Sequence, residues 1–254
     1  MKIGICAGIE NLELCISSGA DFVEINNTAV SRMSESEFES ALELVSKYPG
    51  SVYSCNCLIP SDIRLTGDNV SYDEITEFCE MSFERFSRLG GKVLVFGSAR
   101  AKNVPEGFSR EKAMEQIIKC TRIFGGIAAK YGQTVVIEPL CYAEANIINL
   151  VGESKQLSDL SEMENVKAHV DFYHLMQNGE TLTELKKYAN HLGHVHIASP
   201  VLRTMPTFDD GADYKSFFDI IKEGNYDQTV SYEGKTVFEE EKLTTMFSFL
   251  KGLC

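Results

Sequence analysis

Four ionisable side chains stand at the ends of four successive apolar runs in the second half of the chain: Glu138, Asp171, His196 and Glu233. Three carboxylates gathered in one place repel each other unless a cation neutralises them. Three oxygen ligands and one imidazole nitrogen suit a divalent ion and leave positions open for water or substrate. The pattern therefore predicts one bound divalent metal ion, with Mn²⁺ favoured and Mg²⁺, Co²⁺ and Zn²⁺ as alternatives.

The strands that carry these residues must bring them to one place. Alternate residues of a β-strand point to opposite faces. In the run 134–138, Glu138 has the parity opposite to Val135 and Ile137, and the other three ionisable residues also oppose the apolar residues of their own runs. In a closed barrel this parity faces the axis, an interior that Val, Ile and Leu usually fill. Four such residues on adjacent strands indicate a functional site at the carboxyl ends of the strands.

Short β-branched or aromatic runs alternate with longer segments of helical periodicity along the whole chain, which is typical of repeated βα units around a parallel sheet. Eight strands are predicted, at residues 2–7, 21–26, 51–57, 92–96, 134–138, 166–171, 193–197 and 229–233. Eight helices are predicted, at residues 9–18, 35–47, 72–89, 110–131, 152–161, 181–189, 214–222 and 239–250.

Eight βα units in 254 residues fit a closed (β/α)8 TIM barrel of the α/β class. No linker divides the chain, so residues 1–254 are expected to form one domain. An open doubly wound sheet is the rival, but it normally carries a Gly-rich phosphate turn after its first strand, and Cys6-Ala7-Gly8 is not one.

The charge and composition exclude several classes of protein. A formal net charge of -13 and the absence of any Lys/Arg cluster predict that no nucleic acid binds. No apolar run approaches the roughly 18 residues of a membrane span, and no signal-peptide pattern is evident, so no membrane association is expected. The 8 cysteines form no CxxC pair, which predicts reduced, buried thiols and a cytoplasmic location.

Several stretches are most informative when they are taken as a set. They are Val135-Val136-Ile137-Glu138-Pro139-Leu140, Glu144-Ala145-Asn146, His169-Val170-Asp171-Phe172-Tyr173-His174, His194-Val195-His196-Ile197-Ala198, Ser231-Tyr232-Glu233-Gly234 and Val95-Phe96-Gly97-Ser98. This set resembles the xylose isomerase-like TIM barrels, the sugar phosphate isomerase/epimerase group that includes ketose 3-epimerases and hydroxypyruvate isomerases. The resemblance covers essentially the whole chain.

The resemblance also implies roles for individual residues. Glu138, Asp171, His196 and Glu233 fall on the metal-ligand positions of the family's epimerases, and Glu138 and Glu233 double as their acid/base pair. A metal held in this way polarises a carbonyl and makes the neighbouring C–H group acidic. One glutamate would then remove a proton and the other would return one, which gives epimerisation or aldose–ketose isomerisation according to the carbon that receives it.

Three further residues are implied as contacts of the substrate. His174 and Arg203 would hold substrate oxygens, and Glu144 would bond a hydroxyl near the reacting carbon. Cys141 departs from the family pattern, since the epimerases commonly carry Asn there. Residues 58–68 and 200–211 form the loops that we expect to set specificity.

The sequence as a whole predicts a divalent-metal-dependent sugar isomerase or epimerase that acts through a metal-bound enediolate on a ketose, an aldose or a related α-hydroxy carbonyl. Its partner would be a small sugar or sugar derivative, and no Gly-rich phosphate loop favours a phosphorylated one. A homo-oligomer is compatible with the sequence. The alternatives are an inosose-type dehydratase, a sugar-binding barrel without catalysis, and an endonuclease IV-like repair enzyme, which would need histidines before His169 that this chain lacks.

Overall fold

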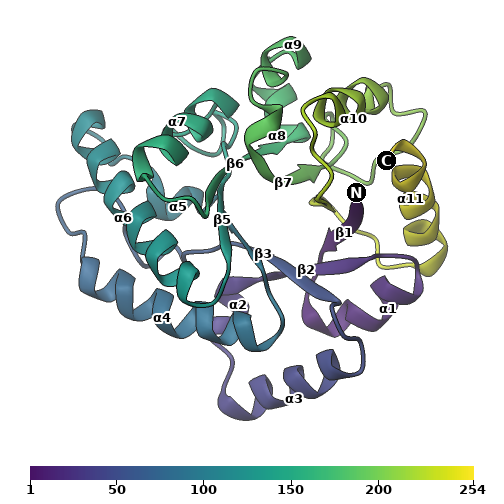
Figure 1. Cartoon of the computed structure of the whole chain (residues 1–254), viewed down its shortest axis with the longest axis horizontal. Helices are drawn as coiled ribbons and strands as arrows, with labels where there is room; N and C mark the ends of the chain where they lie inside the picture. The colour runs from purple at the N-terminus through teal and green to yellow at the C-terminus, as the bar shows by residue number, and fades with distance from the viewer.

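The computed structural model describes residues 1–254 and shows eight parallel strands in a closed ring, with helices around it (Figure 1). The predicted (β/α)8 barrel is confirmed. The strands are β1 (Lys2–Cys6), β2 (Phe22–Asn26), β3 (Val52–Asn56), β4 (Val93–Phe96), β5 (Thr134–Ile137), β6 (Val166–Asp171), β7 (Leu192–Ile197) and β8 (Thr229–Tyr232). Each lies within one residue of its predicted bounds, because the short β-branched runs that mark the strands are local features of the sequence.

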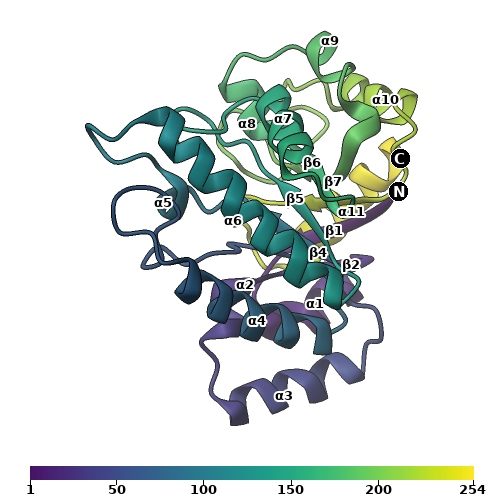
Figure 2. The same cartoon turned by 60° about the vertical axis from the view of Figure 1, so that its left-hand side comes forward.

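The ring closes between its first and last strands. β1 pairs in parallel with β8, with Ile3 opposite Val230 and Ile5 opposite Tyr232. The two ends of the chain lie close together in both Figure 1 and Figure 2. The amino group of Met1 donates to Asp227 Oδ1 just before β8, at 2.8 Å. The first and last βα units are thus joined as directly as any other neighbours.

The helices pack outside the barrel, and α6 lies between α4 and α7 (Figure 2). They are α1 (Leu12–Ser17), α2 (Asn27–Ser31), α3 (Glu35–Ser46), α4 (Tyr72–Arg88), α5 (Ala99–Lys102), α6 (Arg110–Lys130), α7 (Val151–Ser161), α8 (Phe172–Gln177), α9 (Leu182–Leu185), α10 (Tyr214–Glu223) and α11 (Glu240–Leu253), with 3₁₀ turns at Ile9–Asn11 and Ala189–His191. None of them has both the length and the apolar character needed to cross a membrane.

Two predicted helices differ from the structure, and three short helices were not predicted. The predicted helix 9–18 divides into a 3₁₀ turn and α1, and the predicted helix 181–189 is only α9 followed by a second 3₁₀ turn. The short helices α2, α5 and α8 begin directly or soon after strands β2, β4 and β6. At four to six residues they are too short to show helical periodicity, so the sequence gives no sign of them.

The core follows the predicted alternation of the strands. Val135 and Ile137 belong to the large apolar cluster between the barrel and its helices, whereas Val136 packs with Val93 and Val95 in a separate small cluster. The interior of the barrel is otherwise strongly polar at the carboxyl ends of the strands. Burying so many polar side chains lowers the stability of the fold, so their presence indicates a function at this end of the barrel.

The cysteines are all free, as predicted, but they are not all buried. Five are buried, Cys6 is half-buried, and Cys57 and Cys254 are exposed. Cys57 is exposed because it follows β3 at the mouth of the barrel, where its backbone turns with a φ of 49°.

Candidate active site

Four predicted residues converge at the carboxyl ends of β5 to β8. Asp171 is the last residue of β6 and His196 lies in β7, whereas Glu138 and Glu233 directly follow β5 and β8. Glu138 Oε1 lies 3.2 Å from His196 Nδ1, and Glu233 Oε2 lies 3.6 Å from the same nitrogen. Alternation along neighbouring strands thus brings side chains that are far apart in the sequence into contact.

Asp171 completes a compact group of possible ligands. The ligand atoms of Glu138, Asp171, His174 and Glu233 all lie within 4.8 Å of one another, so this group contains the three predicted carboxylates but has His174 where His196 was predicted. Asp171 Oδ1 accepts a hydrogen bond from the backbone N–H of Tyr173 at 2.7 Å, but Oδ2 is buried without a hydrogen-bond partner. Because a buried carboxylate oxygen without a donor is costly, these residues fit a cation bound among the carboxylates.

The pKa values of the carboxyl groups reflect the same crowding. Burial, opposed by His196 but reinforced by Glu233, raises the pKa of Asp171 to about 7. Burial and the charge of Glu233 also raise the pKa of Glu138. Burial acts in the same direction on Glu233, but His196 and Arg203 outweigh it and lower its pKa to about 2. Glu233 is therefore ionised at neutral pH. The positive charge near Glu138 and Asp171 is too small to offset the effect of burial on their pKa values.

His174, in α8, is held in one tautomer. The backbone N–H of Cys141 donates to His174 Nδ1 at 3.1 Å, which places the proton of the neutral ring on Nε2 even though the Arg203 guanidinium group, which can only donate, lies 3.3 Å from that nitrogen. Burial and the charge of Arg203 lower the pKa of His174 to about 3, which keeps the ring neutral. Its Nε2–H group lies 3.7 Å from Asp171 Oδ2. In this tautomer His174 suits a hydrogen bond to a substrate oxygen better than a bond to a metal.

Arg203 enters the site from the loop after β7. Its backbone has a φ of 53°, and its guanidinium group lies over the ring of Tyr173 at 4.9 Å. One guanidinium nitrogen donates to Glu233 Oε2 at 2.6 Å, and the other donates to Glu144 Oε1 at 3.0 Å. The three residues implied to contact substrate, Glu144, His174 and Arg203, therefore lie beside the four predicted metal ligands.

Three polar residues at the site were missed by the sequence analysis. Asn56 Nδ2, at the end of β3, donates to Glu233 Oε1 at 2.7 Å. Glu24, in β2, accepts a hydrogen bond from His196 Nε2 at 2.8 Å. Lys102, in α5, is fully buried and donates from Nζ to the backbone oxygen of Glu138 at 3.0 Å. Alternation in β2 and β3 could have revealed the first two, but no local signal marks Lys102.

A pocket of about 610 Å³ opens above this cluster. Glu138, Glu144, Arg203 and Glu233 form one side of its lining. Of the two loops expected to set specificity, 58–68 contributes Ile59, Pro60 and Ser61, whereas 200–211 contributes only Arg203. The lining on the side of the early strands therefore includes part of the first of these loops but none of the second.

Gly97, directly after β4, leaves room for the carboxylate of Glu138. A Cβ atom at this position would overlap Glu138 Oε2 and lie 3.2 Å from its Cδ atom. We expect Gly97→Ala to displace the carboxylate and reduce turnover about 10²-fold. Because only the mobile end of one side chain must move, the midpoint of thermal unfolding should stay within a few degrees of the wild type.

The matched control is Gly126→Ala in α6, where an added Cβ atom meets nothing within 4 Å. This variant should keep full turnover and gain slightly in stability, because Ala favours a helix. Steady-state kinetics and thermal unfolding of both variants test the contact. Equal turnover for Gly97→Ala and the wild type would show that the position of the Glu138 carboxylate is unimportant.

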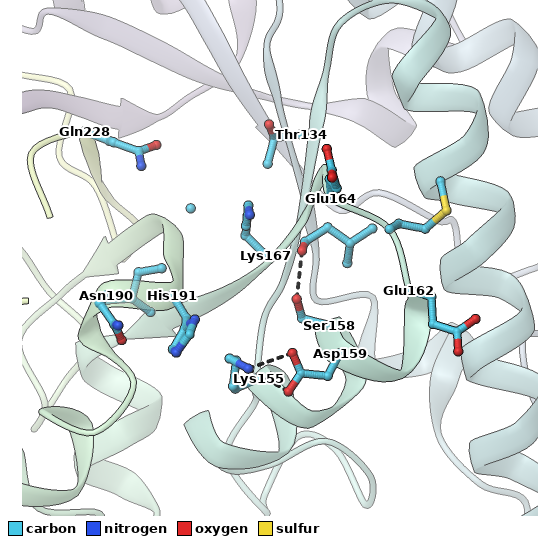
Figure 3. A pocket seen from close by; sticks show the side chains of 14 residues that line it. Thr134, Lys155, Ser158, Asp159, Glu162, Glu164, Lys167, Asn190, His191 and Gln228 are labelled. Atoms are coloured by element: carbon cyan, nitrogen blue, oxygen red, sulfur yellow. Dashed lines mark hydrogen bonds and ion pairs between the residues drawn. The ribbon is translucent and has the colours of Figure 1, made fainter.

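A second hollow, of about 580 Å³, lies at the opposite end of the barrel. Thr134, Val166 and Leu192, which begin β5, β6 and β7, are among its lining residues. Figure 3 shows polar side chains spread around its wall, with only local interactions such as the ion pair of Lys155 and Asp159, at 2.6 Å. Because barrel enzymes place their chemistry at the carboxyl ends of the strands, this hollow is not the candidate active site.

Comparison with known proteins agrees with this geometry. A family model described as "Xylose isomerase-like TIM barrel" matches residues 12–252. The 3-dehydro-D-guloside 4-epimerase of Escherichia coli (strain K12) is 26% identical over 168 residues, which span 63% of this chain and 63% of that enzyme. The match thus covers less than two thirds of the relative's length.

Solved structures extend the likeness to the whole fold. The apo 3-keto-D-glucoside 4-epimerase from E. coli aligns with a TM-score of 0.83 and 21% identity, over 99% of each chain. The D-psicose 3-epimerase with D-tagatose from Clostridium cellulolyticum H10 aligns with a TM-score of 0.85 and 13% identity, over 100% of this chain and 99% of that one. At these identities the likeness establishes a shared fold.

Proposed function

Because the chain belongs to the xylose isomerase-like TIM barrel family, we propose that it is a divalent-metal-dependent sugar epimerase or isomerase. Its substrate would be a ketose or a keto-glycoside with a carbonyl group beside a C–H group that carries a hydroxyl. The curated relative and the two solved structures described above are named as sugar epimerases. The observation that carries the proposal is the convergence of two carboxylates, Glu138 and Glu233, on one pocket beside a buried Asp171 oxygen that has no hydrogen-bond partner.

Glu138, Asp171, His196 and Glu233 would hold the metal. When bound, the metal would polarise the carbonyl group and lower the energy of the negative charge that develops on its oxygen. Mn²⁺ is the ion that we propose for the site. His196 is the proposed nitrogen ligand because its Nε2 is engaged by Glu24 while Nδ1 faces Glu138 and Glu233.

Glu233 is the group that we assign to remove the proton. Its pKa of about 2 keeps it ionised at neutral pH. Bonds from Asn56 Nδ2 at 2.7 Å and Arg203 at 2.6 Å hold its two oxygens in place. Glu138, which belongs to β5 three strands away around the ring, returns a proton. Each such general acid–base step contributes about 10²–10⁴-fold to the rate.

The neighbouring donors position the substrate. His174 stays neutral and offers an Nε2–H group, while Arg203, 3.3 Å from that nitrogen, supplies a fixed positive charge to the lining of the pocket. Donors held rigidly near a developing oxyanion are more effective than water, because they need no reorientation during the reaction. Glu144, held by Arg203 at 3.0 Å, would accept a hydrogen bond from a substrate hydroxyl.

Deuterium exchange tests the proposal directly. The protein is incubated in D₂O with Mn²⁺ and with D-psicose, D-tagatose, D-fructose or a 3-keto-glucoside, and NMR detects deuterium at the carbon beside the carbonyl. We expect exchange and a second epimer or isomer with at least one member of the panel. Binding of a sugar without any exchange would support the sugar-binding alternative instead and overturn the catalytic proposal.

A further inference from the structure

Glu24 is a buried carboxylate inside the barrel that the proposed chemistry does not use. It lies in β2, three strands away from β7 around the closed ring, and only 1% of the residue is exposed. Oε1 accepts a hydrogen bond from His196 Nε2 at 2.8 Å. Oε2 accepts bonds from His194 Nε2 at 2.8 Å, Ser54 Oγ at 2.6 Å and Ser231 Oγ at 2.7 Å. Four donors are thus gathered around one carboxylate in a place that apolar side chains usually fill.

The contact with His196 determines what that ring presents to the pocket. A neutral imidazole has a proton on one nitrogen and a lone pair on the other. Because Glu24 accepts the Nε2 proton, Nδ1 is the nitrogen that faces Glu138 Oε1 at 3.2 Å and Glu233 Oε2 at 3.6 Å, and it presents a lone pair to a cation once its own proton has left. Glu24 therefore fixes both the tautomer and the orientation of the ring.

His194 cannot take over this role. Its Nε2 is bonded to Glu24, and its Nδ1 lies 2.7 Å from Thr229 Oγ1 at the start of β8. Neither nitrogen of His194 is free to face the carboxylate cluster. The half-buried Cys6 lies within 4.8 Å of the Glu24 and His196 ligand atoms, but the bond between those two residues already occupies them. His196 is thus the ring that Glu24 can direct toward the pocket.

We propose that Glu24 is a positioning residue that sets the affinity of the site for its cation by holding His196 with Nδ1 toward Glu138 and Glu233. This inference rests on the proposed function, since it requires that a cation bind there. Carboxylates that orient a metal-binding histidine typically change metal affinity or activity about 10- to 100-fold when they are replaced. The expected effect is therefore on cation binding, with a smaller effect on turnover at saturating cation.

The test compares Mn²⁺ binding by Glu24→Gln and Glu24→Asp with that of the wild type. Each protein is stripped with EDTA, and the dissociation constant for Mn²⁺ alone is measured by isothermal titration calorimetry. We expect Glu24→Gln to weaken binding about 10- to 100-fold. Glu24→Asp, which keeps the charge but draws it away from His196, should weaken binding less, and it preserves the test if Glu24→Gln does not fold.

Ser54→Ala is the matched control, because it removes a hydrogen bond to Glu24 Oε2 and leaves the bond between Oε1 and His196. Its affinity for Mn²⁺ should stay within a few-fold of the wild type. Thermal unfolding in EDTA separates a loss of binding from a loss of folded protein. Unchanged affinity in a folded Glu24 variant would overturn the inference alone, whereas a wild type that binds no Mn²⁺ would overturn the proposed cation site and this inference together.

Discussion

The Glu233→Gln variant should lose turnover by about 10²–10⁴-fold while remaining folded, because glutamine cannot accept a proton but occupies nearly the same volume. Arg203, which donates to one oxygen of Glu233, can still donate to the amide oxygen of glutamine, and Asn56, which donates to the other, can accept from the new NH2 group by turning its own amide. The measurement is deuterium exchange and product formation with the substrate found in the panel. Circular dichroism and thermal unfolding establish that the barrel is intact.

Glu240→Gln is the matched control for this substitution. Glu240 is the exposed first residue of α11, seven positions after Glu233 and outside the pocket. The Glu240→Gln variant should turn over substrate at the rate of the wild type. Near-normal turnover by Glu233→Gln would remove Glu233 as the base, and an equal loss in the control would point to a general effect of lost charge.

Removal of the divalent ion should have an effect of similar size. We expect EDTA to abolish turnover and Mn²⁺ to restore it, because the carboxylates around Asp171 would lose the charge that offsets their repulsion. At a Mn²⁺ concentration of about 100 times its dissociation constant, binding adds about 2.7 kcal/mol to the free energy of unfolding. For a chain of this size that raises the melting temperature by about 5–10 °C.

The stability of the metal-free protein should also depend on pH in a defined window. The pKa of Asp171 rises from 3.8 to about 7 on folding, so the folded state binds the proton more tightly than the unfolded state does. The free energy of unfolding therefore falls as the pH rises through that window. Saturating Mn²⁺ should abolish this loss, because the ion favours the ionised carboxylate.

Asp171→Asn provides the control for the metal experiments. Its remaining Oδ1 can still accept the backbone hydrogen bond of Tyr173, but the carboxylate oxygen without a hydrogen-bond partner is gone. The melting temperature of this variant should respond little to Mn²⁺. A wild-type protein whose turnover and melting temperature are the same in EDTA and in Mn²⁺ would contradict the metal site.

Much of the barrel could be predicted because its signals are local. Strand bounds follow short β-branched runs, and alternation places Glu138, Asp171, His196 and Glu233 inside the ring. The same alternation sets Glu24 apart from its apolar neighbours in β2. Alternation cannot predict which residue Glu24 contacts, because its hydrogen bond with His196 joins residues 172 positions apart.

The positions of side chains in the segments that follow the strands could not be predicted from local features of the sequence. Arg203 reaches Glu233 and Glu144 only because its backbone adopts a left-handed conformation that a non-glycine residue rarely takes. Lys102 becomes buried because a single helical turn after β4 carries it behind Glu138. Both placements depend on the assembled barrel and no period in the sequence reveals them; Arg203 was expected at the site only through the family resemblance, and Lys102 was not expected there.

The pairing of β1 with β8 also affects how the protein is made. β1 leaves the ribosome before its permanent neighbour β8 has been translated, and until then it presents an open edge. Over the same interval the nascent chain has Glu24 without the donors of β7 and β8 that neutralise it. The ring, its internal charge balance and the proposed base Glu233 are therefore completed together, once β8 has been translated.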